Sequence, residues 1–247
     1  MSVGFLRSKL RDSAHNAAGT LQLGGITPLS TTDYPGKLSA VVFCQGCPWR
    51  CGYCHNPHLL ARRGSDGVEW KSIIAFLDRR RGLLDAVVFS GGEPTLQTGI
   101  ADAMREVKQM GFRVGLHTAG IYPRRLKALL PFADWVAMDI KAPFADYAAI
   151  TGRRKSGKSA FESMQLILAS GVDHEFRTTV HPALLPQNSL ATLARWLAQL
   201  GVRNYVLQEF RAQGCANAGL QGAPSYLTDS FLQSMAPLFS TFSVRRA

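Results

Sequence analysis

The sequence predicts an α/β fold in which mainly parallel strands are joined by helical crossovers. Three observations lead to this prediction: six short runs rich in strand formers, helical periodicity between them, and enough apolar residues for one large core. The chain has 247 residues, 46% of them hydrophobic, and a chain of this length buries roughly 70–75% of its unfolded surface. A partial barrel and a doubly wound sheet both fit this alternation. Both place the active site at the carboxyl ends of the strands.

The strand and helix predictions rest on two different periodicities. Runs that are too short for a core helix predict strands at residues 38–44, 85–90, 113–118, 134–139, 175–180 and 203–210. Apolar residues spaced three and four apart, such as Trp70, Ile73 and Leu77, predict helices instead. The helical segments are residues 70–77, 100–107 and 190–200, the last with Ser189 as N-cap, and, more weakly, residues 123–130, 161–169 and 228–239.

The domain organisation is expected to be simple. No composition break and no internal repeat marks a second domain, so residues 21–247 are predicted to form one unit. Residues 1–20 are basic and lack the apolar block of a signal peptide, and we interpret them as a flexible tail. No apolar run approaches the ~18 residues that a membrane span needs, and we expect a cytoplasmic protein.

The chain is strongly basic, with a formal net charge of +11. Such a charge attracts acidic partners, for example a nucleotide, a nucleic acid or an acidic protein face. The cations are scattered, apart from residues 79–81 and a loop with Arg153, Arg154, Lys155 and Lys158. No aromatic residues alternate with them, as a single-stranded nucleic-acid platform requires. We interpret the charge as a solvated basic surface and do not expect nucleic-acid binding.

The cysteines carry the clearest functional signal. Four of the five, Cys44, Cys47, Cys51 and Cys54, fall within eleven residues, and Cys215 is remote. A disulfide framework would spread cysteines through a small secreted chain, so crowded thiols indicate metal ligands or a redox site. The last three have the spacing CxxxCxxC, which can hold three irons of a cubane cluster and leave the fourth iron open. This spacing differs from ferredoxin runs and from zinc sites, whose cysteine pairs lie ~15–20 residues apart.

The segment STTDYPGKLSAVVFCQGCPWRCGYCHNPHLL resembles the cluster-binding opening of radical S-adenosylmethionine (SAM) enzymes. The similarity continues through SGGEPTLQ, WVAMDIKAP and EFRTTVHP and covers roughly residues 22–211. Within this superfamily the chain is similar to glycyl-radical activating enzymes. More narrowly, it resembles the activating proteins of anaerobic ribonucleoside-triphosphate reductases. The resemblance implies a partial (β/α)6 barrel of six strand–helix units.

The resemblance also implies the cofactors and the reaction. Cys47, Cys51 and Cys54 would bind a 4Fe-4S cluster, and the amino and carboxylate groups of S-adenosylmethionine would occupy the open iron. Reduced flavodoxin or ferredoxin would supply an electron, and cleavage of the cofactor would give methionine and a 5′-deoxyadenosyl radical. That radical would abstract a hydrogen atom from a backbone glycine of the reductase, which is the protein substrate.

The segment SGGEP follows a predicted strand and supplies three candidate cofactor-binding residues. Gly91 and Gly92 lack Cβ atoms, so their backbone can approach a ligand closely. Glu93 would accept hydrogen bonds from the ammonium group of the cofactor. A plain strand-to-helix turn is the alternative interpretation of this segment.

Further candidates stand at the ends of the later strands. The resemblance implies that Lys141 meets the methionine carboxylate, and that Thr118 and Asp139 frame the ligand or a nearby cation. Relatives often read DTNG where this chain has His117 followed by threonine, alanine and glycine. The missing aspartate counts against a cation site there. Arg177 is a candidate second partner for the carboxylate, and each of these residues could instead be a satisfied structural group.

The sequence leaves the roles of four further residues undecided, and two of them are cysteines. Tyr53 and His55 flank Cys54 and are candidates for an adenine contact, with simple loop packing as the alternative. Cys44 is interpreted as a buried structural thiol. Cys215 is interpreted as a bystander rather than a second redox group.

One motif competes with this interpretation. Residues 152–159 satisfy the P-loop pattern GxxxxGK[ST]. A P-loop follows a buried strand and opens a helix, so that backbone N–H groups surround the phosphates. The preceding segment FADYAAI is a poor strand, and the three consecutive cations of the motif, residues 153–155, would repel one another in a tight nest. We interpret the segment as a basic insertion.

Two other functions stay open. A radical SAM enzyme that acts on a small molecule, similar to 7-carboxy-7-deazaguanine synthase, would use the same cluster. An iron–sulfur electron-transfer module or a zinc-structured binding module would instead use all four clustered cysteines, including Cys44.

Overall fold

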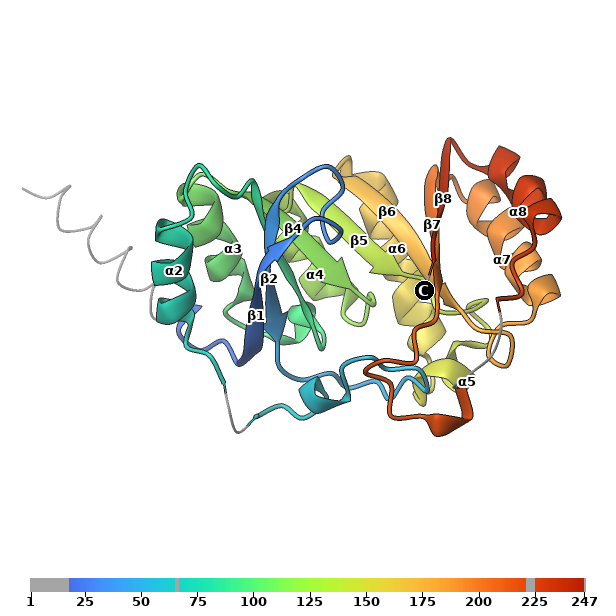
Figure 1. The fold of residues 1–247 in the computed structure, drawn as a ribbon, viewed down its shortest axis with the longest axis horizontal. Helices are drawn as coiled ribbons and strands as arrows, with labels where there is room; N and C mark the ends of the chain where they lie inside the picture. Colours follow the sequence, from blue (N-terminus) through green and yellow to red (C-terminus); the bar gives the residue numbers. More distant parts are fainter. Residues whose placement is uncertain (1–17, 65–66, 221–224, 247) are drawn as a thin grey trace, which may run out of the picture.

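The computed structural model describes residues 18–64, 67–220 and 225–246. They form one eight-stranded sheet whose strands lie in sequence order (Figure 1). The first two strands are antiparallel, and every later pair of neighbours is parallel. The strands are β1 (Leu23–Ser30), β2 (Ser39–Cys44), β3 (Ala86–Gly91), β4 (Arg113–Thr118), β5 (Trp135–Asp139), β6 (Asp173–Val180), β7 (Asn204–Glu209) and β8 (Thr241–Arg245). Because the strands follow in sequence order without the reversal of a doubly wound sheet, the sheet is a partial barrel that is open between its edges, β1 and β8.

Seven helices of the described chain alternate with the parallel strands (Figure 1). They are α2 (Trp70–Asp78), α3 (Ile100–Gln109), α4 (Pro123–Leu129), α5 (Tyr147–Thr151), α6 (Ser156–Ser170), α7 (Gln187–Gln199) and α8 (Asp229–Met235). Strand residues alternate between two apolar clusters. Val87 and Phe89 of β3 belong to the large cluster shared with the helices, and Ala86 and Val88 belong to a smaller one on the other face.

The structure confirms the predicted fold class and adds two strands that the sequence analysis missed. All six predicted strands are present, each with ends shifted by at most two residues. The missed strand β1 contains Gly24, Gly25 and Pro28, which are unfavourable strand residues. The missed strand β8 has only five residues and is largely half-exposed. Short, partly exposed edge strands have little hydrophobic signal in a sequence.

The helix predictions need two corrections. Helix α7 begins at Gln187 behind Pro186, so Ser189 lies inside the helix and is not its N-cap. Helix α6 begins at Ser156, five residues before the predicted start. Helix α8 has Thr228 as its N-cap, a role that the sequence analysis did not assign, and the Thr228 side chain accepts a hydrogen bond from the Phe231 N–H.

The tail predicted for residues 1–20 falls largely outside the described residues. Of its last three residues, Ala18 is buried in the main core. In the described part of the chain, no helix has both the length and the apolar character required to span a bilayer.

The P-loop alternative does not fit the fold. Helix α5, not a strand, precedes Gly152, and the backbone is left-handed at Gly152 and Lys155. A Cβ atom on Gly157 would lie 1.9 Å from the Phe144 carbonyl oxygen, so close packing explains this glycine. The Lys158 ammonium is exposed and lies 3.8 Å from Glu162. These residues form a helix start and not a phosphate cradle.

Candidate active site at the carboxyl ends of the strands

A cavity of about 350 Å³ lies at the carboxyl ends of the parallel strands. Eleven of the twelve site residues predicted from the sequence line it, and Glu93 is the exception. The eleven are Cys47, Cys51, Tyr53, Cys54, His55, Gly91, Gly92, Thr118, Asp139, Lys141 and Arg177. The topology thus brings together residues that are up to 130 positions apart in the chain, because parallel strands end at the same edge.

Backbone hydrogen bonds hold the cysteine loop that follows β2. The Gly46 N–H donates to the Leu59 carbonyl over 2.8 Å, and the Arg50 N–H donates to the Thr151 carbonyl over 2.8 Å. The Gly52 N–H donates to the Ile150 carbonyl over 3.1 Å. The loop is therefore fixed on one side by its own continuation and on the other by helix α5.

The four clustered thiols, Cys44 at the end of β2 and the three in the loop after it, fall into two groups. Cys47, Cys51 and Cys54 are half-buried and line the cavity, whereas Cys44 is fully buried in the main core. Burial raises the pKa of Cys47 to about 12 and also raises the pKa of Cys51 and Cys44. Three thiols, not four, are available to a ligand in the cavity. The position of Cys44 contradicts a module that uses all four clustered cysteines.

The donor set fits a cubane cluster better than a single ion. Across residues 18–64, 67–220 and 225–246, no three histidine, cysteine, aspartate or glutamate side chains converge closely enough to hold one metal ion. Cys47, Cys51 and Cys54 face one cavity from a single short loop, as three separate irons of a cluster require. Burial opposes the charged form of two of these thiols, so ionisation needs positive charge next to the sulfur, which bound iron supplies.

The two glycines after β3 are required by protein packing. A Cβ atom on Gly91, whose φ is +104°, would lie 2.6 Å from the Cys44 nitrogen. A Cβ atom on Gly92 would lie 2.4 Å from the Gly46 carbonyl oxygen. The sequence analysis explained these glycines by close approach to a ligand. The structure shows that they also let the end of β3 pack against the cysteine loop, and their approach to a ligand stays a prediction.

The contact between Glu93 and a ligand ammonium stays a prediction, because the structure shows Glu93 with partners inside the protein. Glu93 is fully buried and does not line the cavity, although Thr118 and Ala119, which donate to it, do. It accepts hydrogen bonds from the Thr95 N–H and hydroxyl (3.1 and 2.6 Å), from the Thr118 hydroxyl (2.7 Å) and from the Ala119 N–H (2.9 Å). Burial raises the pKa of Glu93, and these donors oppose the rise. Glu93 therefore links the end of β3 to the end of β4.

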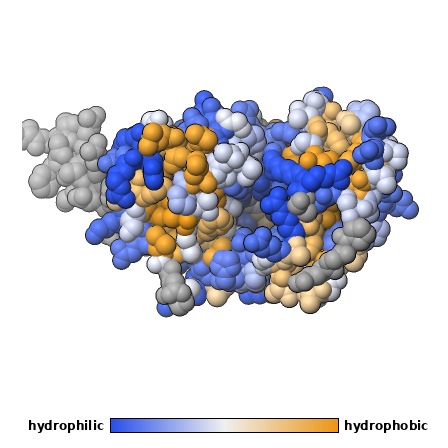
Figure 2. All heavy atoms as spheres, in the orientation of Figure 1, coloured by the Kyte–Doolittle hydropathy of each residue, from blue (hydrophilic) through white to orange (hydrophobic). Residues whose placement is uncertain are grey.

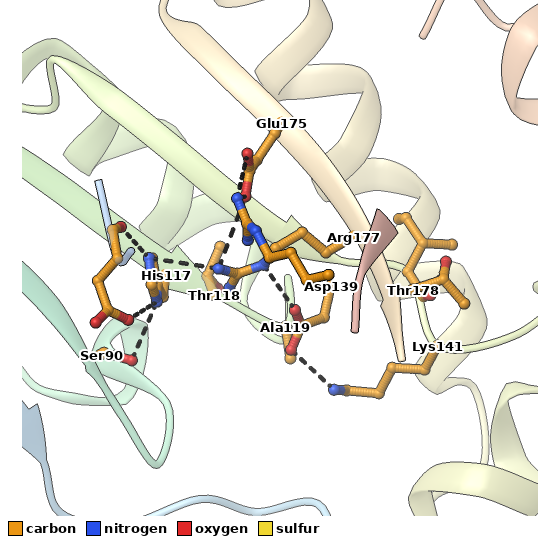
Figure 3. A network of polar contacts seen from close by, with 12 residues as sticks. Ser90, His117, Thr118, Ala119, Asp139, Lys141, Glu175, Arg177 and Thr178 are labelled. Atoms are coloured by element: carbon orange, nitrogen blue, oxygen red, sulfur yellow. Dashed lines mark hydrogen bonds and ion pairs between the residues drawn. The ribbon is translucent and has the colours of Figure 1, made fainter. Parts of the chain in front are cut away.

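A network of charges crosses the cavity wall (Figure 3). Asp139 at the end of β5 lies 3.2 Å from the Lys141 Nζ and 3.3 Å from the Arg177 Nε. The register of β5 and β6 places Asp139 beside Arg177. Burial opposes ionisation of Asp139, but the charges of Lys141 and Arg177 prevail and lower its pKa to about 2. Asp139 is thus a carboxylate at neutral pH and holds two cations in place.

Aromatic residues support Lys141 and the cysteine loop. The Lys141 Nζ lies 5.4 Å from the centre of the Tyr53 ring, and its backbone N–H donates to the Tyr147 hydroxyl over 2.9 Å. His55 stacks on Phe210 with ring centres 5.3 Å apart, and its Nε2 lies 2.9 Å from the Arg211 carbonyl oxygen. Both Tyr53 and His55 line the cavity, and both also contact neighbouring residues of the protein.

His117 occupies the position where the sequence analysis found an aspartate missing. Its Nε2 lies 2.8 Å from the Asp33 carbonyl oxygen, and its Nδ1 lies 3.3 Å from the Ser90 hydroxyl (Figure 3). Burial and the nearby charge of Arg177 lower the pKa of His117 to about 3. A neutral imidazole beside a guanidinium is a poor ligand environment for a further cation.

A second cavity, of about 810 Å³, adjoins the first and was missed from the sequence. The two cavities share five lining residues, which are Asp33, His55, Arg177, Thr179 and Gln208. The remaining lining comes from the loop after β1 and from the ends of β7 and β8. Figure 2 shows strongly hydrophilic atoms gathered where β8 ends near the C-terminus. Two adjoining spaces, one lined by thiols and one polar, therefore lie at the open side of the barrel.

The sequence analysis also missed Glu175, which lies directly behind Arg177 (Figure 3). Glu175, Arg177 and Thr179 alternate along β6 and therefore point to the same face. Because side chains two residues apart on a strand share a face, the position two residues before Arg177 was a candidate that the sequence alone could have given.

Comparison with known proteins assigns the fold and the cofactors. The profile of the Radical SAM superfamily matches residues 41–198, and the chain belongs to this superfamily. Its members use a 4Fe-4S cluster and S-adenosylmethionine, in agreement with the cofactors expected from the sequence.

Two relatives extend over most of the chain. A Methanocaldococcus jannaschii protein, whose name places it provisionally among the glycyl-radical enzyme activating enzymes, is 34% identical over 197 residues. This match covers 76% of the present chain and 79% of the relative. The pyruvate formate-lyase-activating enzyme of Clostridium pasteurianum is 32% identical and covers 66% and 70% of the two chains.

Solved structures share the fold at low identity. Methylornithine synthase (PylB) matches 95% of this chain and 69% of its own, with a TM-score of 0.61 and 11% identity. Streptococcus suis SuiB bound to the precursor peptide SuiA matches 83% and 48%, also with a TM-score of 0.61 and 11% identity. At this identity the likeness concerns the fold alone.

Proposed function

We propose that this protein is a glycyl-radical enzyme activase whose protein substrate is an anaerobic ribonucleoside-triphosphate reductase. The observation that carries the proposal is the thiol-lined cavity, which continues into a larger polar cavity at the open side of the barrel. A polar space of about 810 Å³ suits a peptide segment, whose backbone needs hydrogen-bond partners. The similarity to activating enzymes over two thirds or more of the chain supports the same class.

The cofactor chemistry has one essential feature: on one-electron reduction, the cluster and S-adenosylmethionine together supply a 5′-deoxyadenosyl radical that abstracts a hydrogen atom from the substrate. Cys47, Cys51 and Cys54 hold the cluster. Lys141 and Arg177 offer two buried cations to the carboxylate of the cofactor, and these are charge-assisted contacts. The protein binds and orients the cofactor and excludes water from the site, and the cofactor performs the difficult step.

The remaining site residues prepare this arrangement. Asp139 holds Lys141 and Arg177 in place, since it lies within 3.3 Å of both. Glu93 fixes Thr118, whose hydroxyl also accepts a hydrogen bond from the Gly120 N–H over 3.0 Å. Gly91 and Gly92 keep the end of β3 against the cysteine loop. Tyr53 and His55 close the cavity on the side of this loop.

The electron donor is reduced flavodoxin or ferredoxin, and the reaction takes place in the cytoplasm. Exposed cations flank the cysteine loop: Arg50 belongs to it, and the Arg153 Nε donates to the Pro48 carbonyl over 2.9 Å. A positive face of this kind increases the association rate of an acidic carrier protein.

The function is tested on anaerobically purified protein reconstituted with iron and sulfide and reduced with dithionite. We expect 5′-deoxyadenosine to form on addition of S-adenosylmethionine, and a glycyl radical to appear on the purified reductase by electron paramagnetic resonance. Cys51→Ser should abolish both signals, while Cys44→Ser should keep a cluster because Cys44 lies in the core. A stable cluster that yields no 5′-deoxyadenosine with any partner would contradict the proposal. 5′-Deoxyadenosine without a radical on the reductase would contradict this choice of substrate.

A further inference from the structure

Glu175 is a buried carboxylate that none of the steps above uses. It lies on β6 with 2% of its surface exposed. Among the residues that the structure describes, its Oε1 is the one buried side-chain oxygen or nitrogen without a hydrogen-bond partner. Native proteins rarely leave a buried acceptor unpaired, because its desolvation is not compensated. Such a group calls for an explanation beyond packing.

Glu175 contacts two arginines, Arg177 and Arg245, that line the larger cavity. The Arg245 Nη2 from β8 lies 2.9 Å from Oε1 and 3.0 Å from Oε2, and only the second contact has hydrogen-bond geometry. On the other side, the Arg177 Nη1 lies 3.9 Å from Oε1. Charges therefore alternate from β8 to β5 through Arg245, Glu175, Arg177, Asp139 and Lys141.

Among the described residues, the guanidinium of Arg177 has three polar neighbours, of which two are carboxylates and the third is the His117 Nε2, 3.5 Å from its Nη1. Asp139 contacts its Nε at 3.3 Å, and Glu175 faces its Nη1 at 3.9 Å. A guanidinium is planar and has five N–H donors, so two fixed carboxylates determine where its other donors point. Arg177 lines both cavities, and its orientation decides what it offers to a ligand in either one.

Packing alone does not account for this arrangement. A buried ion pair is seldom more stabilising than well-packed apolar residues of similar volume, because both charges lose their hydration. A carboxylate at this position is explained if the arginine in front of it must stay oriented.

We infer that Glu175, together with Arg245, is a positioning residue that orients Arg177 at the boundary between the two cavities. The inference rests on the proposed function, in which Arg177 meets the carboxylate of S-adenosylmethionine. It goes further by making β8, the last strand of the sheet, a part of the cofactor site.

The primary test is Glu175→Gln in the full-length, reconstituted protein. We expect the Kd for S-adenosylmethionine and the KM in 5′-deoxyadenosine formation to rise by about tenfold or more, while kcat and iron content stay within about twofold. Arg245→Met should change Kd in the same direction. The matched control is Glu162→Gln, which removes an exposed carboxylate paired with Lys158 and should leave Kd unchanged. An unchanged Kd in Glu175→Gln would overturn the inference.

A double-mutant cycle separates positioning from a merely structural role. In an Arg177→Met background, Glu175→Gln should change Kd little, because the group through which Glu175 acts is gone. If Glu175→Gln weakens binding equally in both backgrounds, the inference is wrong.

The same cycle on the thermal midpoint of the full chain needs no bound cofactor. It should show coupling between Glu175 and Arg177, and additive shifts would also overturn the inference. Coupling without any SAM cleavage would contradict the proposed function and leave the pairing of Glu175 with Arg177 standing.

Discussion

At the scale of single residues, burial decides which groups are available for chemistry. Asp139 and Glu93 both belong to the predicted site, but their surroundings differ. Asp139 faces two cations in the cavity wall, whereas Glu93 does not line the cavity and accepts hydrogen bonds from four donors. The sequence predicts a polar residue at each strand end, but side-chain orientation depends on neighbours from other elements. The role of Glu93 could therefore not be predicted from its motif.

The role of Glu93 leads to a prediction about stability. In Glu93→Gln, an NH₂ group replaces an oxygen that accepts hydrogen bonds, so at least one buried donor loses its partner. We expect the free energy of unfolding to fall by about 1–3 kcal/mol. Urea unfolding of the full chain measures this change, with the exposed Glu162→Gln as control. A loss no larger than that of the control would show that the buried hydrogen bonds contribute nothing.

His117 makes stability depend on pH. Its pKa is about 3 in the folded protein and near 6.5 in an unfolded chain, so between these values the unfolded state binds the extra proton. The stability that the neutral form contributes is complete above pH 6.5 and is lost as the pH falls towards 3. We expect a slope of up to about 1.4 kcal/mol per pH unit in this window. His117→Gln should remove this part of the slope in urea unfolding, and the exposed His58→Gln should not.

At the scale of elements, close backbone packing explains sequence signals that also resemble functional motifs. The glycine of GKS in residues 152–159 allows α6 to begin against the Phe144 carbonyl. Gly91 and Gly92 allow β3 to end against the cysteine loop. Hydrophobic periodicity predicts the central strands well, because they are buried on both faces. It fails for β1 and β8, whose exposure removes the pattern.

At Gly157 we expect a change in stability opposite to the one that Gly→Ala usually produces in a helix. Gly→Ala inside a helix ordinarily stabilises by about 1 kcal/mol. At Gly157 the new Cβ would lie 1.9 Å from the Phe144 carbonyl oxygen, so we expect destabilisation of about 1–3 kcal/mol instead. Thermal or urea unfolding measures it, and Gly52→Ala, whose Cβ would find its nearest neighbour 4.0 Å away, is the control. A stabilised Gly157→Ala variant would contradict the packing described here.

At the scale of the whole molecule, the site depends on an open barrel. The sequence predicts parallel strands and therefore a shared edge, and this prediction brings eleven of the twelve candidate residues to one cavity. It says nothing of the larger cavity, because that space lies between the loop after β1 and the ends of β7 and β8. A cavity between the two edges of a sheet depends on curvature and closure, which no local pattern encodes.

The larger cavity predicts a separation of two activities. Thr32 lines this cavity but not the thiol-lined one, so Thr32→Trp should obstruct a protein substrate and spare the cofactor. We expect formation of the glycyl radical to fall by about tenfold or more, equivalent to about 1.4 kcal/mol. Formation of 5′-deoxyadenosine without the partner should change little. The surface variant Thr192→Trp on α7 serves as control, and an equal loss of both activities would show that the two spaces are not separate.

The cysteine sulfurs differ in burial, and this difference determines which of them oxidise when the protein is exposed to air. When oxygen destroys a cluster, the released sulfurs of Cys47, Cys51 and Cys54 lie on one short, half-buried loop. They can oxidise to sulfenic acids or to disulfides with one another, and both products are reversed by a thiol reductant. Cys44, sealed in the core, stays reduced and out of reach. These early oxidation products are thus formed at cysteines that a reductant can reach, before iron and sulfide rebuild the centre.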